Sequence, residues 1–135
     1  MSDWNAQIIA EFRANGGKVA MFGDNPLVIL HTIGAKSGAV REIPLVAHYE
    51  GDEVTVFASK GGAPTHPDWY YNLLAHPEID VEAPDGTYRA RIEQLPADRA
   101  AAKLQAQAQL MPQFAEYVVS AAPRVIPAFS ITRID

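Results

Sequence analysis

Hydrophobic and polar positions along the chain follow patterns that predict a small set of strands and helices. An apolar run begins at Leu27 and ends at a loop with two glycines, which predicts a buried core strand followed by a turn. Apolar and polar positions alternate over residues 41–49, so we expect one half-buried strand there. Pro44 lies within this strand and has no N–H for the ladder, which places the strand at a sheet edge or at a bulge.

Similar patterns over the rest of the chain predict further strands and flanking helices. We expect helices at residues 3–15, 67–76, 96–111 and 113–122, and strands at residues 53–60, 78–83, 87–95 and 127–134. Most of these strands are joined by turns too short for the crossover helices of a parallel sheet. The pattern therefore predicts an α+β domain whose mainly antiparallel sheet, of about six strands, forms a small closed or partly closed barrel.

Composition narrows the class of protein. With 135 residues, 48% of them hydrophobic, the chain is long enough for one domain, residues 1–135, and too short for two. A formal net charge of -5 argues against a nucleic-acid partner, because proteins that bind nucleic acids carry a basic surface. The chain has no cysteine, which excludes disulfides, thiolate catalysis and cysteine-ligated metals and is compatible with a reducing compartment.

The beginning of the sequence is acidic and amphipathic, without the basic and apolar regions of a secretory signal. No apolar run approaches the roughly 18 residues that a membrane span needs. We therefore expect a cytoplasmic protein without a membrane span. The sequence leaves peripheral membrane contact and the oligomeric state open.

The loop after the first apolar run concentrates groups suited to an anion. Glycines at Gly34 and Gly38 permit a backbone in which several N–H groups face outward together. Lys36 offers a full charge, Ser37 a hydroxyl and Arg41 a planar fork that suits phosphate or carboxylate. An ordinary hairpin turn with solvated charges is the alternative, since these residue types are common in turns. The segment G-A-K-S-G has neither the spacing of a phosphate-binding loop or a dinucleotide fold nor the central serine of a hydrolase nucleophile elbow.

The four histidines do not indicate a metal site. His31, His48, His66 and His76 show no spacing typical of ligands, either with one another or with carboxylates. His31 closes a buried strand, where a hydrogen-bonded core histidine is a better interpretation than a catalytic base. We therefore expect no metal ion in this protein.

Four landmarks follow one another in the sequence: T-I-G-A-K-S-G-A-V-R (residues 32–41), I-P-L (43–45), A-S-K-G-G (58–62) and H-P-D-W-Y-Y-N-L (66–73). Over residues 27–81 this order resembles the deazaflavin-dependent nitroreductase family, whose members are oxidoreductases that use coenzyme F420. The resemblance implies a split β-barrel with the deazaflavin in a groove on the barrel. It also implies hydride transfer from reduced F420 to an electron-poor acceptor, such as an enone, a lactone, a quinone or a nitro compound.

The resemblance implies seven cofactor-binding residues, namely Lys36, Ser37, Arg41, Ser59, Lys60, Asp68 and Trp69. The first three match family positions that hold the phosphate and the acidic tail of the coenzyme. The next two match the loop that approaches the ring system, and the last two match positions that border the cofactor. Plain core packing is the alternative for Trp69, because aromatic residues at a helix start usually bury area first.

The resemblance also places Tyr117 in the substrate pocket. Tyr117 or Ser59 would supply the proton that accompanies the hydride, directly or through water. Three positions depart from the family pattern: Ala35 replaces an arginine, and Val46 and Phe114 replace tyrosines of nitroimidazole-reducing members. These departures leave cofactor use in place but put activity on nitroimidazoles in doubt.

These observations favour one function and leave two others open. The favoured function is an F420-dependent reductase of a small electron-poor molecule, in which C5 of the reduced ring delivers the hydride. FMN is the alternative cofactor. The second function is a carrier or binding protein that holds F420, a flavin or haem in the same barrel without turning over a substrate. The third is a structural interaction domain.

Overall fold

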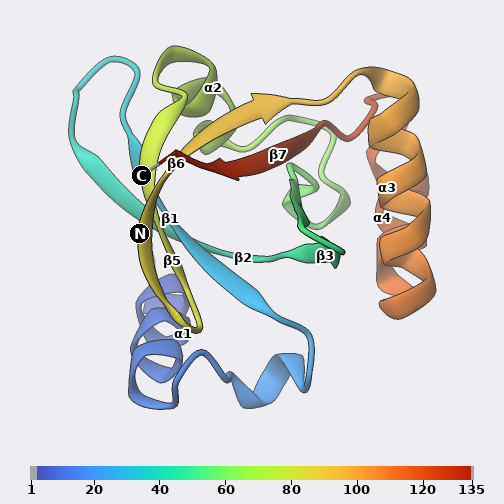
Figure 1. Cartoon of the computed structure of the whole chain (residues 1–135). Helices are drawn as coiled ribbons and strands as arrows, with labels where there is room; N and C mark the ends of the chain where they lie inside the picture. Colours follow the sequence, from blue (N-terminus) through green and yellow to red (C-terminus); the bar gives the residue numbers. More distant parts are fainter. Residues whose placement is uncertain (1–2, 135) are drawn as a thin grey trace.

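The computed structural model describes residues 3–134 as a curled sheet flanked by helices (Figure 1). The α-helices of this part of the chain are α1 (Asp3–Ala14), α2 (Asp68–Ala75), α3 (Ala97–Leu110) and α4 (Gln113–Ala121), and the short 3-10 turns are η1 (Ala20–Phe22) and η2 (Lys60–Gly62). The strands are β1 (Leu27–Ile33), β2 (Val40–Val46), β3 (His48–Glu50), β4 (Glu53–Phe57), β5 (Glu78–Ala83), β6 (Gly86–Gln94) and β7 (Ala128–Arg133). None of the helices between residues 3 and 134 is both long and apolar enough to cross a membrane.

The strands form one antiparallel sheet in the order β2-β1-β5-β6-β7-β4-β3. β2 runs directly into β3 along the chain, yet these two strands occupy opposite ends of the order. The sheet therefore curls back on itself, and β2 and β4 come into contact. The α+β class and the curled, antiparallel barrel-like sheet expected from the sequence are confirmed.

The sheet has seven strands, where the sequence predicted about six, because residues 41–49 do not form one continuous strand. β2 ends at Val46 and β3 begins at His48, and the interruption lets the chain pass from one end of the sheet order to the other. The alternation over residues 41–49 places His48, with Glu42, on the face opposite Ile43 and Leu45, but His48 is buried with 5% exposure. The reason is that α3 covers it, and Gln107 of that helix lies 2.8 Å from Nδ1 of His48.

Pro44 occupies the edge position that its chemistry predicts. β2 pairs only with β1, where Pro44 lies opposite Ile29. Because no strand pairs with the other side of β2, the missing N–H of Pro44 removes no bond from the sheet. The expected edge strand is therefore confirmed.

Apolar side chains pack on both the inner and the outer face of the curled sheet. α2 contributes Trp69 and Leu73 to the cluster inside the curl. On the outer face, α1 packs against β1 through Ile8 and Phe12, while α3 and α4 pack against β4 and β7 through residues such as Phe114. Each large side chain buried in this way contributes about 1.5–3 kcal/mol to folding. Figure 1 shows that α1 and the α3–α4 pair cover different parts of the sheet.

Candidate functional site

The loop between β1 and β2 is held in one conformation by its own hydrogen bonds. Gly34 donates its N–H to the carbonyl of Ala39 (2.8 Å), and Gly38 donates its N–H to the carbonyl of Gly34 (2.9 Å). The hydroxyl of Ser37 accepts a further hydrogen bond from the N–H of Ala39 (3.1 Å). A Cβ atom at position 34 would lie 2.5 Å from that hydroxyl, so a larger residue there would displace the Ser37 side chain from this bond. The side chains of the loop therefore project from a defined backbone.

This loop and the start of α2 form the walls of an open groove of about 750 Å³. The residues that line the groove are Gly34, Ala35, Lys36, Ser37, Arg41, Asp68, Tyr71 and Asn72. Four of the predicted cofactor-binding residues therefore meet here: Lys36, Ser37, Arg41 and Asp68. Lys36 and Arg41 bring two positive charges to the groove, against the single carboxylate of Asp68. The groove has the donor set that an acidic ligand requires.

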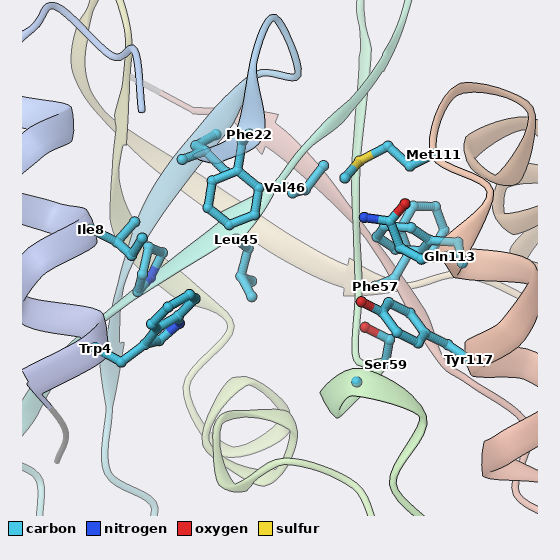
Figure 2. A pocket seen from close by; sticks show the side chains of 14 residues that line it. Trp4, Ile8, Phe22, Leu45, Val46, Phe57, Ser59, Met111, Gln113 and Tyr117 are labelled. Atoms are coloured by element: carbon cyan, nitrogen blue, oxygen red, sulfur yellow. The ribbon is translucent and has the colours of Figure 1, made fainter. Parts of the chain in front are cut away.

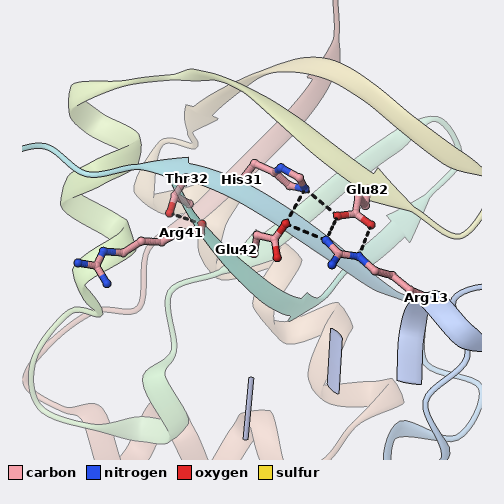
Figure 3. Close-up of polar contacts among 6 residues, drawn as sticks. All are labelled: Arg13, His31, Thr32, Arg41, Glu42 and Glu82. Atoms are coloured by element: carbon pink, nitrogen blue, oxygen red, sulfur yellow. Dashed lines mark hydrogen bonds and ion pairs between the residues drawn. The ribbon is translucent and has the colours of Figure 1, made fainter. Parts of the chain in front are cut away.

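Two hydrogen bonds hold the walls of this groove in place. The hydroxyl of Thr32 donates to the carbonyl of Arg41 at 2.9 Å, and Figure 3 shows the Arg41 side chain extending away from a neighbouring ionic cluster. The N–H of Ala35 donates to Oδ1 of Asn72 at 2.9 Å and so joins the loop to α2. Sequence reasoning missed Asn72. Its spacing of four residues from Asp68, which puts both on one helix face, was the available signal.

A smaller cleft of about 170 Å³ lies between α1 and α4 (Figure 2). Its lining residues are Trp4, Ile8, Phe22, Leu27, Pro44, Leu45, Val46, Phe57, Ser59, Gly61, Met111, Gln113, Phe114 and Tyr117. Most of these side chains are apolar or aromatic, and Ser59, Gln113 and Tyr117 add polar groups. Figure 2 shows Ser59 and Tyr117 on one wall and Trp4 on the opposite wall. Both residues expected to supply a proton therefore line the same cleft.

Close packing between η2 and α4 sets the position of this wall. A Cβ atom at Gly62 would lie 2.8 Å from Cβ of Ser120 and 3.1 Å from Cα of Tyr117, so only glycine allows the approach. Along the same wall, the ring of Phe57 packs on Phe114 with 5.9 Å between centroids. Phe114 in turn packs on Tyr117 with 5.2 Å between centroids. The aromatic side chains thus support one another along the wall of the cleft.

Two of the predicted cofactor-binding residues line neither the groove nor the cleft. Lys60 is exposed and donates through Nζ to the hydroxyl of Thr65 (3.1 Å). Trp69 is only 8% exposed and packs on Phe129, with 6.1 Å between centroids. Core packing therefore accounts for the indole of Trp69. The cofactor contacts expected of Lys60 and Trp69 stay predictions.

β2 connects the groove and the cleft. Arg41, near the start of this strand, lines the groove, whereas Pro44, Leu45 and Val46 at its end line the cleft. At about 3.3 Å per residue, Arg41 and Leu45 are about 13 Å apart along the strand. An elongated ligand with an acidic end and a planar end would find complementary surfaces along this one strand.

The sequence profile of the F420H(2)-dependent quinone reductase family matches residues 4–132. The chain belongs to this family. A curated relative, an F420H(2)-dependent quinone reductase of Mycobacterium tuberculosis, is 38% identical over 74 residues, which are 53% of this chain and 50% of the relative. The chain spans about half the length of the curated relatives it matches. The resemblance to deazaflavin-dependent reductases that the sequence motifs indicated is confirmed.

Two solved structures are similar to this chain, one in sequence and fold and the other in fold alone. The F420-H2 dependent reductase FDR-A has a TM-score of 0.69 and 34% sequence identity, over 78% of this chain and 93% of that chain. The heme storage protein HutZ from Vibrio cholerae has a TM-score of 0.60 over 97% of this chain and 91% of that chain. Its identity of 10% shows the fold alone, and it confirms the split-barrel architecture.

In this quinone reductase family member, an ionic cluster joins α1 to the sheet (Figure 3). Arg13 donates to Glu42 at 2.8 Å and to Glu82 at 2.5 Å, and Nε2 of His31 lies 2.7 Å from Glu82. The hydrogen bond from Arg13 is the main reason that the pKa of Glu82 lies below its usual value, and the bond to His31 adds to the shift. His31 thus makes the hydrogen bond that its place in the strand suggested.

The same cluster has the chemistry of a metal site. Ligand atoms of His31, Glu42 and Glu82 all lie within 4.8 Å of one another. The spacing in the sequence gave no sign of this group, because three different strands bring the residues together. Arg13 pairs with both carboxylates and so anchors α1 to the sheet. The expectation that the protein holds no metal ion stays a prediction.

Two departures from the nitroimidazole-reducing pattern lie in the cleft. Val46 and Phe114 are both among its lining residues, and neither side chain carries a hydroxyl.

Gln113 is a polar lining residue of the cleft that sequence reasoning missed. It lies four residues before Tyr117 on α4, and that spacing was the available signal for a shared face.

Proposed function

We propose that this protein transfers a hydride from reduced F420 to a quinone-type acceptor. The observation that carries the proposal is the arrangement along β2, where a groove with Lys36 and Arg41 leads to an apolar cleft with Ser59 and Tyr117. Family membership over residues 4–132 supports the same cofactor and the same class of acceptor.

Each part of this arrangement has its own task. Lys36 and Arg41 bind the acidic part of the cofactor through charge-assisted hydrogen bonds, each worth about 1.5–3 kcal/mol. The bound deazaflavin supplies the hydride, so the protein needs no catalytic dyad of its own. The aromatic walls of the cleft exclude water and align the acceptor. The hydroxyl of Tyr117, or that of Ser59, donates the accompanying proton to a carbonyl oxygen of the acceptor.

The dimensions of the cleft favour the ring of a planar acceptor. Its volume of about 170 Å³ and its aromatic lining suit a quinone, and enones, lactones and nitro compounds share the same electron-poor character. Nitroimidazoles are the exception. We expect little activity on them, because Val46 and Phe114 offer no hydroxyl to a nitro group.

The test is a titration of the purified protein with F420, with FMN as a competitor, followed by anaerobic oxidation of reduced F420 with a panel of acceptors. We expect F420 to bind in preference to FMN and quinones to oxidise it catalytically. Binding without turnover across quinones, enones, lactones and nitro compounds would favour a non-catalytic carrier of F420, a flavin or haem. Absence of any cofactor binding would indicate a structural interaction domain.

We also propose a domain organisation, a class of partner and a cellular location for this protein. Residues 1–135 would act as one cofactor-binding domain, since the seven strands of residues 3–134 belong to one sheet. Its partner would be a small electron-poor molecule rather than a nucleic acid, consistent with the net charge of -5. A cytoplasmic location fits a chain without cysteine.

A further inference from the structure

Arg124, just after α4, uses all five of its side-chain N–H groups in hydrogen bonds. Its guanidinium donates to the main-chain carbonyls of Ala58 (2.9 Å) and Ser59 (2.8 Å), and twice to that of Ala63 (2.8 and 3.0 Å). The fifth bond, 3.0 Å long, joins it to Nδ1 of His66. One side chain thus ties the segment from Ala58 to His66 to the end of α4.

The acceptors of these five bonds are neutral groups. Arginine can only donate, so Nδ1 of His66 is the acceptor and the ring proton sits on Nε2. Burial, and after it the charge of Arg124, hold the pKa of His66 below its ordinary value, which agrees with a neutral ring. The guanidinium therefore organises the main chain of this segment instead of pairing with a carboxylate there.

The segment that Arg124 holds forms part of the wall of the cleft. Ser59 and Gly61 both line the cleft. The backbone there is unusual, because Lys60 and Gly61 have φ values of +49° and +61°, a region that a lysine rarely adopts. Tertiary contacts must maintain such a conformation, and Arg124 supplies five of them.

We propose that Arg124 is a positioning residue for hydride transfer, which sets the place of the Ser59 hydroxyl in the cleft by fixing the carbonyls of residues 58, 59 and 63. This inference rests on the proposed function, in which Ser59 faces the acceptor. A lysine cannot substitute for Arg124, because three donors on one nitrogen cannot reach acceptors arranged around a planar fork. A misplacement of about 1 Å near the reacting groups can lower a rate about 100-fold.

The test compares Arg124→Lys, Ser59→Ala and the double variant in steady-state assays with reduced F420 and a quinone. Arg124→Lys should lower kcat about 10- to 100-fold and change the Kd for F420 by a smaller factor, because the charged groove that binds the acidic part of the cofactor lies elsewhere. In the Ser59→Ala background the same substitution should lower kcat less than about threefold, because the residue it acts through has lost its hydroxyl. Circular dichroism and thermal melts check that each variant is folded.

The matched control is Arg91→Lys, since Arg91 forms an exposed ion pair with Glu78 on the other hairpin. This variant should leave kcat unchanged. An unchanged kcat in Arg124→Lys, or equal losses with and without the Ser59 hydroxyl, would overturn the proposal, because both results fit a residue that only stabilises the fold.

A second variant covers the case in which Arg124→Lys does not fold. His66→Ala removes one of the four acceptors of Arg124 and should lower kcat more in the wild-type background than in Ser59→Ala. Equal effects in the two backgrounds would again overturn the proposal. A different outcome would be that the wild-type protein oxidises reduced F420 with none of the acceptors tested. That outcome would reject the proposed function and this inference together.

Discussion

The main-chain N–H of Ala35 lies 2.9 Å from the side-chain oxygen of Asn72, and this hydrogen bond joins the β1–β2 loop to α2. Because Lys36 and Ser37 follow directly, we expect Asn72 to hold the loop in the shape that binds the cofactor. In Asn72→Leu, the leucine side chain is similar in size to asparagine but has no oxygen to accept the hydrogen bond from Ala35. The affinity of this variant for F420 in a fluorescence titration should fall about 2- to 10-fold, as expected for one hydrogen bond worth about 0.5–1.5 kcal/mol.

Two further variants make this test specific. Asn15→Leu, exposed after the end of α1, is the control and should keep the wild-type affinity. Asn72→Asp retains an acceptor but adds a negative charge to the groove, so it should weaken binding more at low salt than at high salt. Wild-type affinity in Asn72→Leu would show that the loop keeps its shape without α2.

Lys36 supplies one of the two positive charges in the groove. Lys36→Ala should weaken F420 binding about 10- to 100-fold, because a hydrogen bond to a charged group is worth about 1.5–3 kcal/mol. The same fluorescence titration measures the effect. Lys18→Ala, an exposed lysine between α1 and η1, should bind F420 as the wild type does. If the two variants bind F420 equally well, the loop does not hold the phosphate.

Features set by neighbouring residues were predictable from the sequence. Lys36, Ser37 and Arg41 fall within six positions between an apolar run and an alternating strand, and these patterns alone place them at one turn. Pro44 marked an edge strand, because a missing N–H acts at a single position. The antiparallel class followed from the hairpins, which join strands that are neighbours both in the sequence and in the sheet.

Features set by contacts between distant segments were not predictable. The break at Ala47 depends on how the whole sheet curls, and residues 41–49 contain no turn signal at that point. Three of the acceptors of Arg124 are main-chain carbonyls more than 60 positions away, and a carbonyl has no residue type that a sequence could reveal. Trp69 had two interpretations for the same reason, since its packing on Phe129 brings together distant parts of the chain.

Tyr117 carries a hydroxyl on the wall of the cleft that also contains Ser59. Tyr117→Phe keeps the packing on Phe114 and removes only the hydroxyl. With reduced F420 and a quinone, its kcat should fall about 100-fold or more while the Kd for F420 stays unchanged. Tyr49→Phe, which alters a half-exposed tyrosine on β3, is the control and should keep the wild-type kcat. If Tyr117→Phe is fully active and Ser59→Ala is not, the donor is Ser59.

Gly62 and Gly61 are neighbours in η2 with different surroundings. A Cβ atom at Gly62 would lie 2.8 Å from Ser120 and 3.1 Å from Tyr117, whereas Gly61 has no such atom within 4 Å. Both glycines have positive φ values, so alanine should cost about 1–2 kcal/mol of unfolding free energy at either position. Overpacking should add about 1–3 kcal/mol for Gly62→Ala alone. Equal stabilities of the two variants in urea unfolding would contradict the close packing of η2 on α4.

His66 makes stability depend on pH, and its surroundings determine the sign. Burial first, and then the charge of Arg124, lower the pKa of His66 below the ordinary value of 6.5, because both disfavour the imidazolium. In the unfolded chain the ring titrates near pH 6.5, so at lower pH the unfolded state binds more protons than the folded state. The neutral ring of His66 therefore makes its full contribution to the free energy of unfolding above about pH 6.5. This contribution is lost as the pH falls towards the pKa of His66 in the folded protein.

Urea unfolding at about pH 7.5 and about pH 5.5 measures this effect. His66→Asn keeps an acceptor for Arg124 but takes up no proton, so its free energy of unfolding should decrease less over the interval than that of the wild type. Hydrogen bonds from lysine or arginine lower the pKa of three carboxylates, Glu50, Glu53 and Glu82, below the ordinary value of 4.5. These carboxylates therefore lose their stabilising effect only at pH values below 4.5, outside the pH interval of this measurement. The remaining histidines are common to both proteins and cancel in the comparison. An equal decrease in the two proteins would contradict a neutral His66 and, with it, the direction of its hydrogen bond with Arg124.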